Sequence, residues 1–166
     1  MTDVLVAFAS RHGATEELAH AIGTELSHSG LSVDVLPMDE VGSPDSYSAY
    51  VLGSAVYMGS WMPAARRFLE RHGSLIAERP TWLFSSGPIG DPSANGAAGF
   101  DASALLAATN ARDHHLFGGK LDRSALNLAE RLMARVVRVP YGDYRDWTIA
   151  TAWATAISRA IGVEHS

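Results

Sequence analysis

Cysteine is absent from the 166 residues, and basic residues are outnumbered by acidic ones. The lack of cysteine excludes a disulfide scaffold, thiolate zinc sites, iron–sulfur clusters and cysteine catalysis. The formal net charge of −5 at pH 7 argues against nucleic acid as the main partner, because neutralising phosphates requires a basic face.

Long hydrophobic runs are also missing from the start of the chain. The first apolar run covers residues 4–9, and no basic leader precedes it. That run is too short for the core of a signal peptide or for a membrane span. We therefore expect a cytoplasmic protein, with at most peripheral contact at the inner face of the membrane.

The residues that are present favour a globular domain. Hydrophobic residues make up 47% of the chain and charged residues 19%, a balance typical of folded rather than disordered proteins. A chain of this length can bury a core without disulfides or metals. We expect one domain covering residues 1–166.

Short apolar runs alternate with helical patterns along the chain. Strands are expected at residues 4–9, 31–36, 49–54, 81–85 and 113–117. The continuous apolar run at 4–9 is typical of a strand buried on both faces of a parallel sheet. Five such strands predict a doubly wound, parallel α/β sheet with helices on both faces. Right-handed crossovers favour the strand order 2-1-3-4-5.

The helices are predicted from apolar spacing and from glycine and proline. Leu18, Ile22 and Leu26 mark one face of a helix that ends at Gly30. A second helix is expected to begin at Pro63 and to stop at Gly73, with a short helix around 102–108. Residues 91–99 and 139–144 are expected to be loops. Two more helices are expected, one carrying Leu128, Leu132 and Val136, the other carrying Ile149, Trp153, Ile157 and Ile161.

The loop after the first strand is a candidate phosphate site. Ligands of such sheets bind beyond the carboxyl ends of the strands, where the strand order reverses. Backbone N–H groups and the positive end of the next helix would point at an anion there. The alternative is a turn in which Thr15 only caps the helix. The loop contains Ser10, Arg11, His12, Gly13, Ala14 and Thr15.

Two further loops are expected to converge on the same edge. One includes Ser54, Ala55, Val56, Tyr57, Met58, Gly59 and Trp61, and the other includes Ser86, Gly87, Pro88, Ile89 and Gly90. They offer apolar cover and backbone groups, which a flavin ring needs at its faces and at its polar edge. Trp61 fits either a contact to the ring or packing of the second helix on the sheet.

The loop of residues 10–15 resembles the phosphate loop of the flavodoxin family, S/T-x-S/T-G-x-S/T. Ser10, Gly13 and Thr15 match, and His12 replaces the middle hydroxyl; its imidazole N–H can also donate to a phosphate. The resemblance implies that the sheet is flavodoxin-like and that the protein binds FMN. It also implies that a peptide rearrangement at Gly59 contacts the flavin N5 and that the backbone of residues 86–90 holds the pyrimidine edge.

Within that family the chain is most similar to the menaquinone-dependent protoporphyrinogen oxidase branch. Residues 53–59, 117–121 and 144–147 carry this resemblance. It implies an FMN oxidoreductase whose partners are small molecules, a porphyrinogen that is oxidised and a quinone that is reduced. The basic residue that this branch tends to carry before the tyrosine–glycine pair of its ring loop is missing from residues 56–59.

Other functions stay open at this stage. A flavodoxin-type electron carrier is one alternative, although the ring loops contain almost no acidic residue for steering to a basic partner. A deazaflavin carries the same ribityl phosphate and is a second alternative, and a cofactor-free interaction domain is a third. No side chain stands out as a catalytic acid or base. No metal site is expected, and the adjacent His114 and His115 should point to opposite faces of a strand.

Overall fold

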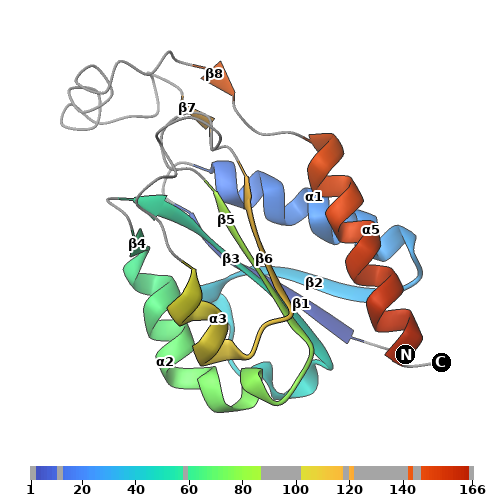
Figure 1. Cartoon of the computed structure of the whole chain (residues 1–166), viewed down its shortest axis with the longest axis horizontal. Coiled ribbons are helices and arrows are strands. Elements are labelled where there is room, and N and C mark those ends of the chain that lie inside the picture. The colour runs from blue at the N-terminus through green and yellow to red at the C-terminus, as the bar shows by residue number, and fades with distance from the viewer. Residues whose placement is uncertain are drawn as a thin grey trace.

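The central sheet is built from parallel strands with helices on both of its faces, as the computed structural model shows (Figure 1). The structure describes residues 3–10, 13–57, 60–86, 102–117, 120–121, 142–143 and 147–164. The parallel strands are β1 (Asp3–Ala9), β2 (Ser32–Pro37), β3 (Ala49–Tyr57), β5 (Thr81–Ser86) and β6 (Asp113–Phe117). They are arranged in the order β2-β1-β3-β5-β6.

This strand order confirms the prediction from the sequence, since the parallel strands counted alone follow 2-1-3-4-5. Three short strands were not predicted. β4 (Ser60–Trp61) turns back antiparallel on the end of β3, and β7 (Lys120–Leu121) pairs with β8 (Gly142–Asp143) in a separate two-stranded sheet. β8 lies within residues 139–144, which were expected to be loop.

The helices are divided between the two faces of the sheet. α1 (Ala14–His28) and α5 (Trp147–Glu164) cover one face, whereas α2 (Pro63–Ala77) and α3 (Ser103–Thr109) lie on the other (Figure 1). Two short 3₁₀ segments, η1 (Met38–Glu40) and η2 (Pro44–Ser46), connect β2 to β3. Among the helices in the described ranges, none combines the length and the apolar run needed to cross a bilayer.

Alternating side chains of the strands build a separate core on each face. In β1, Val4, Val6 and Phe8 face α1 and α5. Leu5, Ala7 and Ala9 of the same strand belong to the core under α2. Both sets are almost fully buried, which explains the unbroken apolar run of this strand.

The end of α1 follows the sequence prediction. Gly30 adopts a left-handed conformation with φ +95°, which a residue with a side chain adopts only with strain. Its N–H donates to Ser27 O at 3.0 Å, and Leu31 N–H donates to Leu26 O at 3.4 Å. These two bonds form the Schellman arrangement that ends many helices at glycine.

The prediction that Gly73 stops the second helix is wrong, because α2 continues to Ala77. A glycine inside a helix costs about 1 kcal/mol relative to alanine. Burial of one large aliphatic side chain contributes about 1.5–3 kcal/mol, and Ile76, beyond the glycine, is fully buried. The helix ends just before Pro80, where the Thr81 hydroxyl lies 3.0 Å from the Ile76 carbonyl oxygen.

The predicted apolar face of the last helix is also partly wrong. The buried residues of α5 are Ala150, Trp153, Ala154, Ile157 and Ile161, whereas Ile149 is 44% exposed. A strict spacing of four residues drifts by about 40° per step around a helix of 3.6 residues per turn. Over three such steps Ile149 leaves the buried face. The predicted loop at 91–99 and the predicted helix with Leu128, Leu132 and Val136 lie outside the described residues.

Substitution of Gly53 tests the packing between β3 and β5. A Cβ at Gly53 would collide with the buried Phe84 ring, whereas a Cβ at Gly73 would meet nothing within 4 Å. We expect G53A to lower the free energy of unfolding by about 1–3 kcal/mol or more. We expect G73A to raise it by about 0.5–1 kcal/mol. Urea denaturation measures both, and a G53A protein as stable as the wild type would contradict this packing.

Candidate functional site

The carboxyl ends of β1, β3 and β5 lie side by side at one edge of the sheet. Ala9 of β1 is paired with Ser54 of β3, and Ser54 is paired with Ser85 of β5. The three predicted loops leave the sheet from these neighbouring positions. The structure therefore brings together the residues Ser10, Ser54 and Ser86 from which those loops begin.

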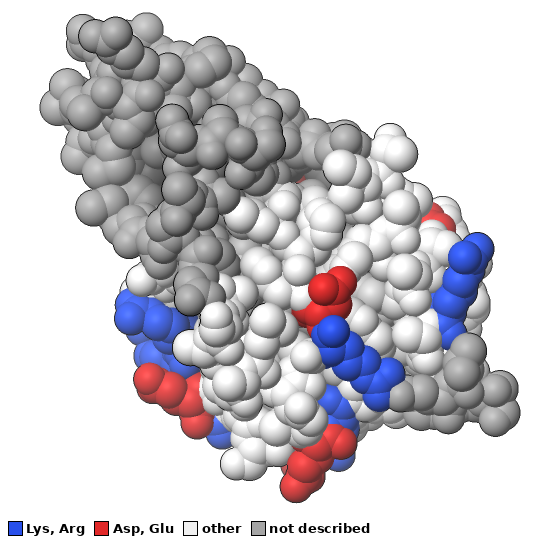
Figure 2. All heavy atoms as spheres, in the orientation of Figure 1, with Lys and Arg blue, Asp and Glu red and all other residues white. Residues whose placement is uncertain are grey.

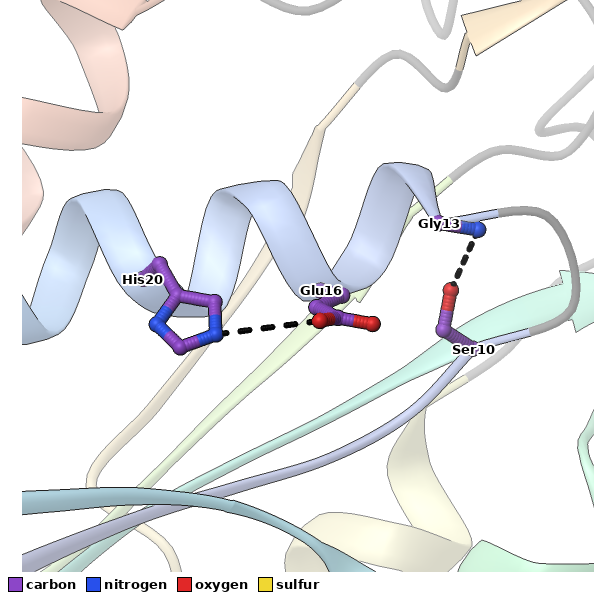
Figure 3. Close-up of polar contacts among 4 residues, drawn as sticks. All are labelled: Ser10, Gly13, Glu16 and His20. Atoms are coloured by element: carbon purple, nitrogen blue, oxygen red, sulfur yellow. Dashed lines mark hydrogen bonds and ion pairs between the residues drawn. The ribbon is translucent and has the colours of Figure 1, made fainter.

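The first loop is tied to the start of α1 by one hydrogen bond. The Gly13 backbone N–H donates to the Ser10 hydroxyl oxygen at 2.9 Å, which bridges the turn (Figure 3). Gly13 has a left-handed backbone with φ 88°, so a side chain at this position would be strained. Arg11 and His12 lie outside the described residues.

The first turn of α1 has donors without a capping side chain. The helical hydrogen bonds begin with Glu17 N–H to Gly13 O at 3.0 Å, and no side chain caps the helix at Gly13. The preceding N–H groups, of Ala14, Thr15 and Glu16, have no acceptor within the helix because of their position in its first turn. Together with the positive end of the helix dipole they favour an anion.

Thr15 adds a buried hydroxyl to this turn. Its side chain is 1% exposed, and Oγ1 has no hydrogen-bond partner among the described residues. A buried polar group without a partner costs about 1–3 kcal/mol. The alternative in which Thr15 caps the helix is thus not seen among the described residues.

Two side chains of α1 near this turn pair with each other. Glu16 and His20 are one helical turn apart, and Oε2 of Glu16 lies 3.8 Å from Nε2 of His20 (Figure 3). Both side chains are more than half exposed. The Glu16 carboxylate thus makes its contact along the side of α1.

The second loop begins as a short antiparallel hairpin. Val56 is paired with Trp61, and Tyr57 with Ser60. The fully buried Ser54 closes its base, because its hydroxyl oxygen accepts from Met62 N–H at 3.0 Å and its O–H donates to Ala55 O at 2.9 Å. Met58 and Gly59, which join the two strands, lie outside the described residues.

Trp61 is buried and bonded rather than turned outward. Its side chain is 2% exposed and belongs to the core under α2. The indole N–H donates to the Ser85 hydroxyl oxygen at 2.7 Å, and Ser85 Oγ lies 2.7 Å from His114 Nε2. Packing on the sheet is therefore the role of Trp61 that is seen, and a contact to a ring stays a prediction.

The third loop begins at Ser86, the last residue of β5, which is 3% exposed. Gly87, Pro88, Ile89 and Gly90 lie outside the described residues, so their predicted contacts stay predictions. Neither Ser85 nor His114 was predicted to be a site residue from the sequence. The sequence signal was indirect, a histidine in a strand that ends in the apolar residues Leu116 and Phe117.

His114 and His115 point to opposite faces, as predicted. His114 contacts Ser85 in the α2 layer, whereas the His115 ring lies 4.3 Å from the Phe117 ring and 5.9 Å from the Trp153 ring between their centres. Burial lowers the pKa of both histidines below the usual 6.5, and the Asp113 carboxylate partly opposes this effect. Within the described ranges, no group of histidines and carboxylates could hold a metal ion.

The charged side chains on the visible face are mixed in sign. Figure 2 shows acidic and basic groups of the described residues beside one another, with neither sign covering a continuous area. On α2, for example, the exposed Glu70 lies between Arg67 and Arg71 in the sequence. This face therefore offers no single-sign field among the described residues for steering a charged partner.

Comparison with known proteins places the fold. The model of a family described as a flavodoxin domain matches residues 5–147. The protoporphyrinogen IX dehydrogenase (quinone) of Escherichia coli is 26% identical over 83 residues, which are 49% of this chain and 46% of that protein. The match thus spans about half the length of this curated relative.

Solved structures share the architecture at low sequence identity. Rubredoxin oxygen:oxidoreductase of Desulfovibrio gigas matches with a TM-score of 0.65 and 14% identity, covering 100% of this chain and 37% of that one. A cysteine-to-serine variant of a flavodoxin from Pseudomonas aeruginosa matches with a TM-score of 0.59 and 16% identity, covering 96% and 98%. At sequence identities this low, these structural matches show a common fold and nothing more.

Removal of the Thr15 hydroxyl should stabilise the ligand-free protein. T15V replaces a buried hydroxyl that has no partner by a methyl group, so we expect the free energy of unfolding to rise by up to about 1 kcal/mol. T109V is the matched control, since the buried Thr109 hydroxyl donates to Leu105 O at 2.7 Å. We expect T109V to destabilise by about 1 kcal/mol. A loss of stability in T15V comparable to that in T109V would contradict the assignment.

Acidification should destabilise the fold through His114 and His115. Their pKa values are lower in the folded protein than the ordinary 6.5, so the unfolded chain binds protons first as the pH falls. Stability is then constant above about pH 6.5 and declines below it. Denaturation by urea between pH 7.5 and pH 5.5 measures this slope. The double variant H114Q/H115F should flatten it, and a wild-type protein that gains stability on acidification would rule out the lowered pKa values.

Proposed function

Since the chain belongs to the flavodoxin domain family, we propose that it binds FMN where β1, β3 and β5 end and acts as an FMN-dependent oxidoreductase. The observation that carries the proposal is the buried Thr15 hydroxyl without a partner at the uncapped start of α1. An anion at this place would supply the missing acceptor. A phosphate group meets that requirement with several oxygens at once.

The residues at the start of α1 fit the phosphate of FMN. The Thr15 hydroxyl and the N–H groups of Ala14, Thr15 and Glu16 would donate to it. Ser10 uses an oxygen lone pair for Gly13 N–H, so its own O–H is a further donor. The left-handed Gly13 lets the backbone approach closely. Arg11 and His12, which the family resemblance also assigns to the phosphate, complete the proposed set.

The hairpin of β3 and β4 would lie beside the flavin ring. Ala55, Val56, Tyr57, Met58 and Gly59 belong to the proposed ring site. The segment Ser86, Gly87, Pro88, Ile89 and Gly90 belongs to it as well, at the polar edge. FMN supplies hydride and single-electron chemistry when bound, and the protein supplies binding, orientation and exclusion of water.

We extend the proposal to the reaction of the curated relative. That protein is named a protoporphyrinogen IX dehydrogenase that uses quinone. A reduced porphyrin-like substrate and a quinone acceptor are therefore the proposed partners of this chain. The partial match, over about half of each protein, supports the substrate class less directly than the family match supports the cofactor.

FMN titration of the ligand-free protein tests the cofactor and its phosphate site. We expect FMN fluorescence to be quenched on binding. T15V should lower the affinity for FMN about tenfold, equivalent to ~1.4 kcal/mol, because one hydrogen-bond donor to the phosphate is lost. Riboflavin, which has no phosphate, should bind to the wild type much more weakly than FMN does. Its affinity should be about the same for T15V as for the wild type. T109V serves as the control with unchanged affinity.

The same titration separates the alternatives. Tight binding of a deazaflavin, without binding of FMN, would show that a deazaflavin and not FMN is the cofactor. Loaded protein that is reduced by a porphyrinogen and reoxidised by a quinone would support the proposed reaction, whereas loaded protein that exchanges electrons only with a redox protein would indicate a carrier. Failure of the protein to bind either FMN or a deazaflavin would overturn the proposal.

A further inference from the structure

We infer that Ser85 and His114 are positioning residues for the proposed flavin ring site, acting through the side chain of Trp61. The inference rests on the proposed function, because it concerns how the hairpin of β3 and β4 is placed beside the ring. Its basis is one continuous line of two hydrogen bonds, from Trp61 to Ser85 and from Ser85 to His114, each 2.7 Å long.

The indole N–H of Trp61 determines the direction of the first bond in this line. An indole N–H only donates, so the Ser85 oxygen accepts from Trp61. The contact between Ser85 Oγ and His114 Nε2 at 2.7 Å is compatible with either direction, because the hydroxyl keeps its hydrogen and a second lone pair. When Nε2 carries no hydrogen, the Ser85 O–H donates to it, and each bond then polarises and strengthens the next.

The line connects the two proposed ring loops to each other and to the neighbouring strand. Trp61 ends the hairpin that begins at Val56, and Ser85 directly precedes the segment of residues 86–90. His114 belongs to β6, on the far side of β5 from β3. Loss of either bond would therefore loosen the hairpin relative to the second loop without touching the phosphate site.

Burial makes these two hydrogen bonds difficult to replace by water. Trp61 is 2% exposed and Ser85 is fully buried, so water cannot easily replace a partner that is removed. The hairpin has its other anchor at Ser54, whose hydroxyl accepts from Met62 N–H. Ser54 holds the hairpin to β3 through Met62, and Trp61 holds it to β5 through Ser85.

A matched pair of variants in β5 distinguishes positioning from a purely structural role. S85A removes the link between Trp61 and His114. T81V removes a buried hydroxyl at the opposite end of the same strand, where Thr81 lies 3.0 Å from Ile76 O. We expect both variants to lower stability to a similar degree. Only S85A should lower the affinity for FMN, by about five- to tenfold for one lost hydrogen bond.

Two variants of His114 add a test by rescue. Glutamine places an amide oxygen near the position of Nε2 and can accept from Ser85, so H114Q should retain nearly the wild-type affinity for FMN. H114L offers no acceptor and should lose affinity as S85A does. In the ligand-free protein, S85A and H114L should also speed solvent exchange of the Trp61 indole N–H in NMR spectra, and H114Q should not.

The outcomes separate the two proposals. Wild-type protein that fails to bind FMN overturns the proposed function. Wild-type protein that binds FMN, with S85A and H114L binding equally well, overturns the positioning role. Equal weakening by H114Q and H114L, or by S85A and T81V, also overturns it, because the effect would then follow stability rather than the hydrogen bond. If S85A does not fold, the comparison of H114Q with H114L decides.

Discussion

Burial of the central strands on both faces is the constraint on which this structure depends. β5 shows it most clearly, since all six of its residues are buried. Polar side chains can enter such strands only where a partner is within reach. In β3 and β5 they occur at the carboxyl ends as Ser54, Ser85 and Ser86, and at the start of β5 as Thr81. One partner of Ser54, Met62, and one partner of Ser85, Trp61, come from the segment that joins β3 to α2, so the hydrogen bonds of these buried hydroxyls also hold a candidate ring loop in place.

Thr15 is the exception to this rule among the described residues. Ser54, Ser85 and Thr81 are as deeply buried, and each has a partner within the protein. Thr15 instead lies at the start of a helix whose first N–H groups also lack a capping side chain. Unpaired donors that share one place indicate a ligand more strongly than any of them alone, because each would otherwise be an independent loss of stability.

Local signals in the sequence predicted the strands and their order, and long-range contacts explain what they missed. The run at residues 4–9 and the Schellman end at Gly30 depend on neighbouring residues. The end of α2 depends on the burial of Ile76 in a core built by distant strands, which overrides the helix-breaking tendency of Gly73. From the sequence, Trp61 fitted a ring contact and a packing role equally well. Its partner Ser85 is 24 residues away and His114 lies a further 29 residues along, so no local pattern distinguished the two roles.

The position of Ser85 is itself set by packing on the opposite face of the sheet. Gly53 and Phe84 are directly paired between β3 and β5, and the Phe84 ring occupies the space that a side chain at Gly53 would need. Phe84 belongs to the core under α1 and α5, whereas Ser85, the next residue, faces α2. The absence of a side chain at Gly53 therefore lets the Phe84 ring pack without displacing β5 from its ladder with β3. Because Ser85 follows Phe84 in the same strand, a side chain at Gly53 that displaced Phe84 would also move the Ser85 hydroxyl relative to Trp61 on the other face.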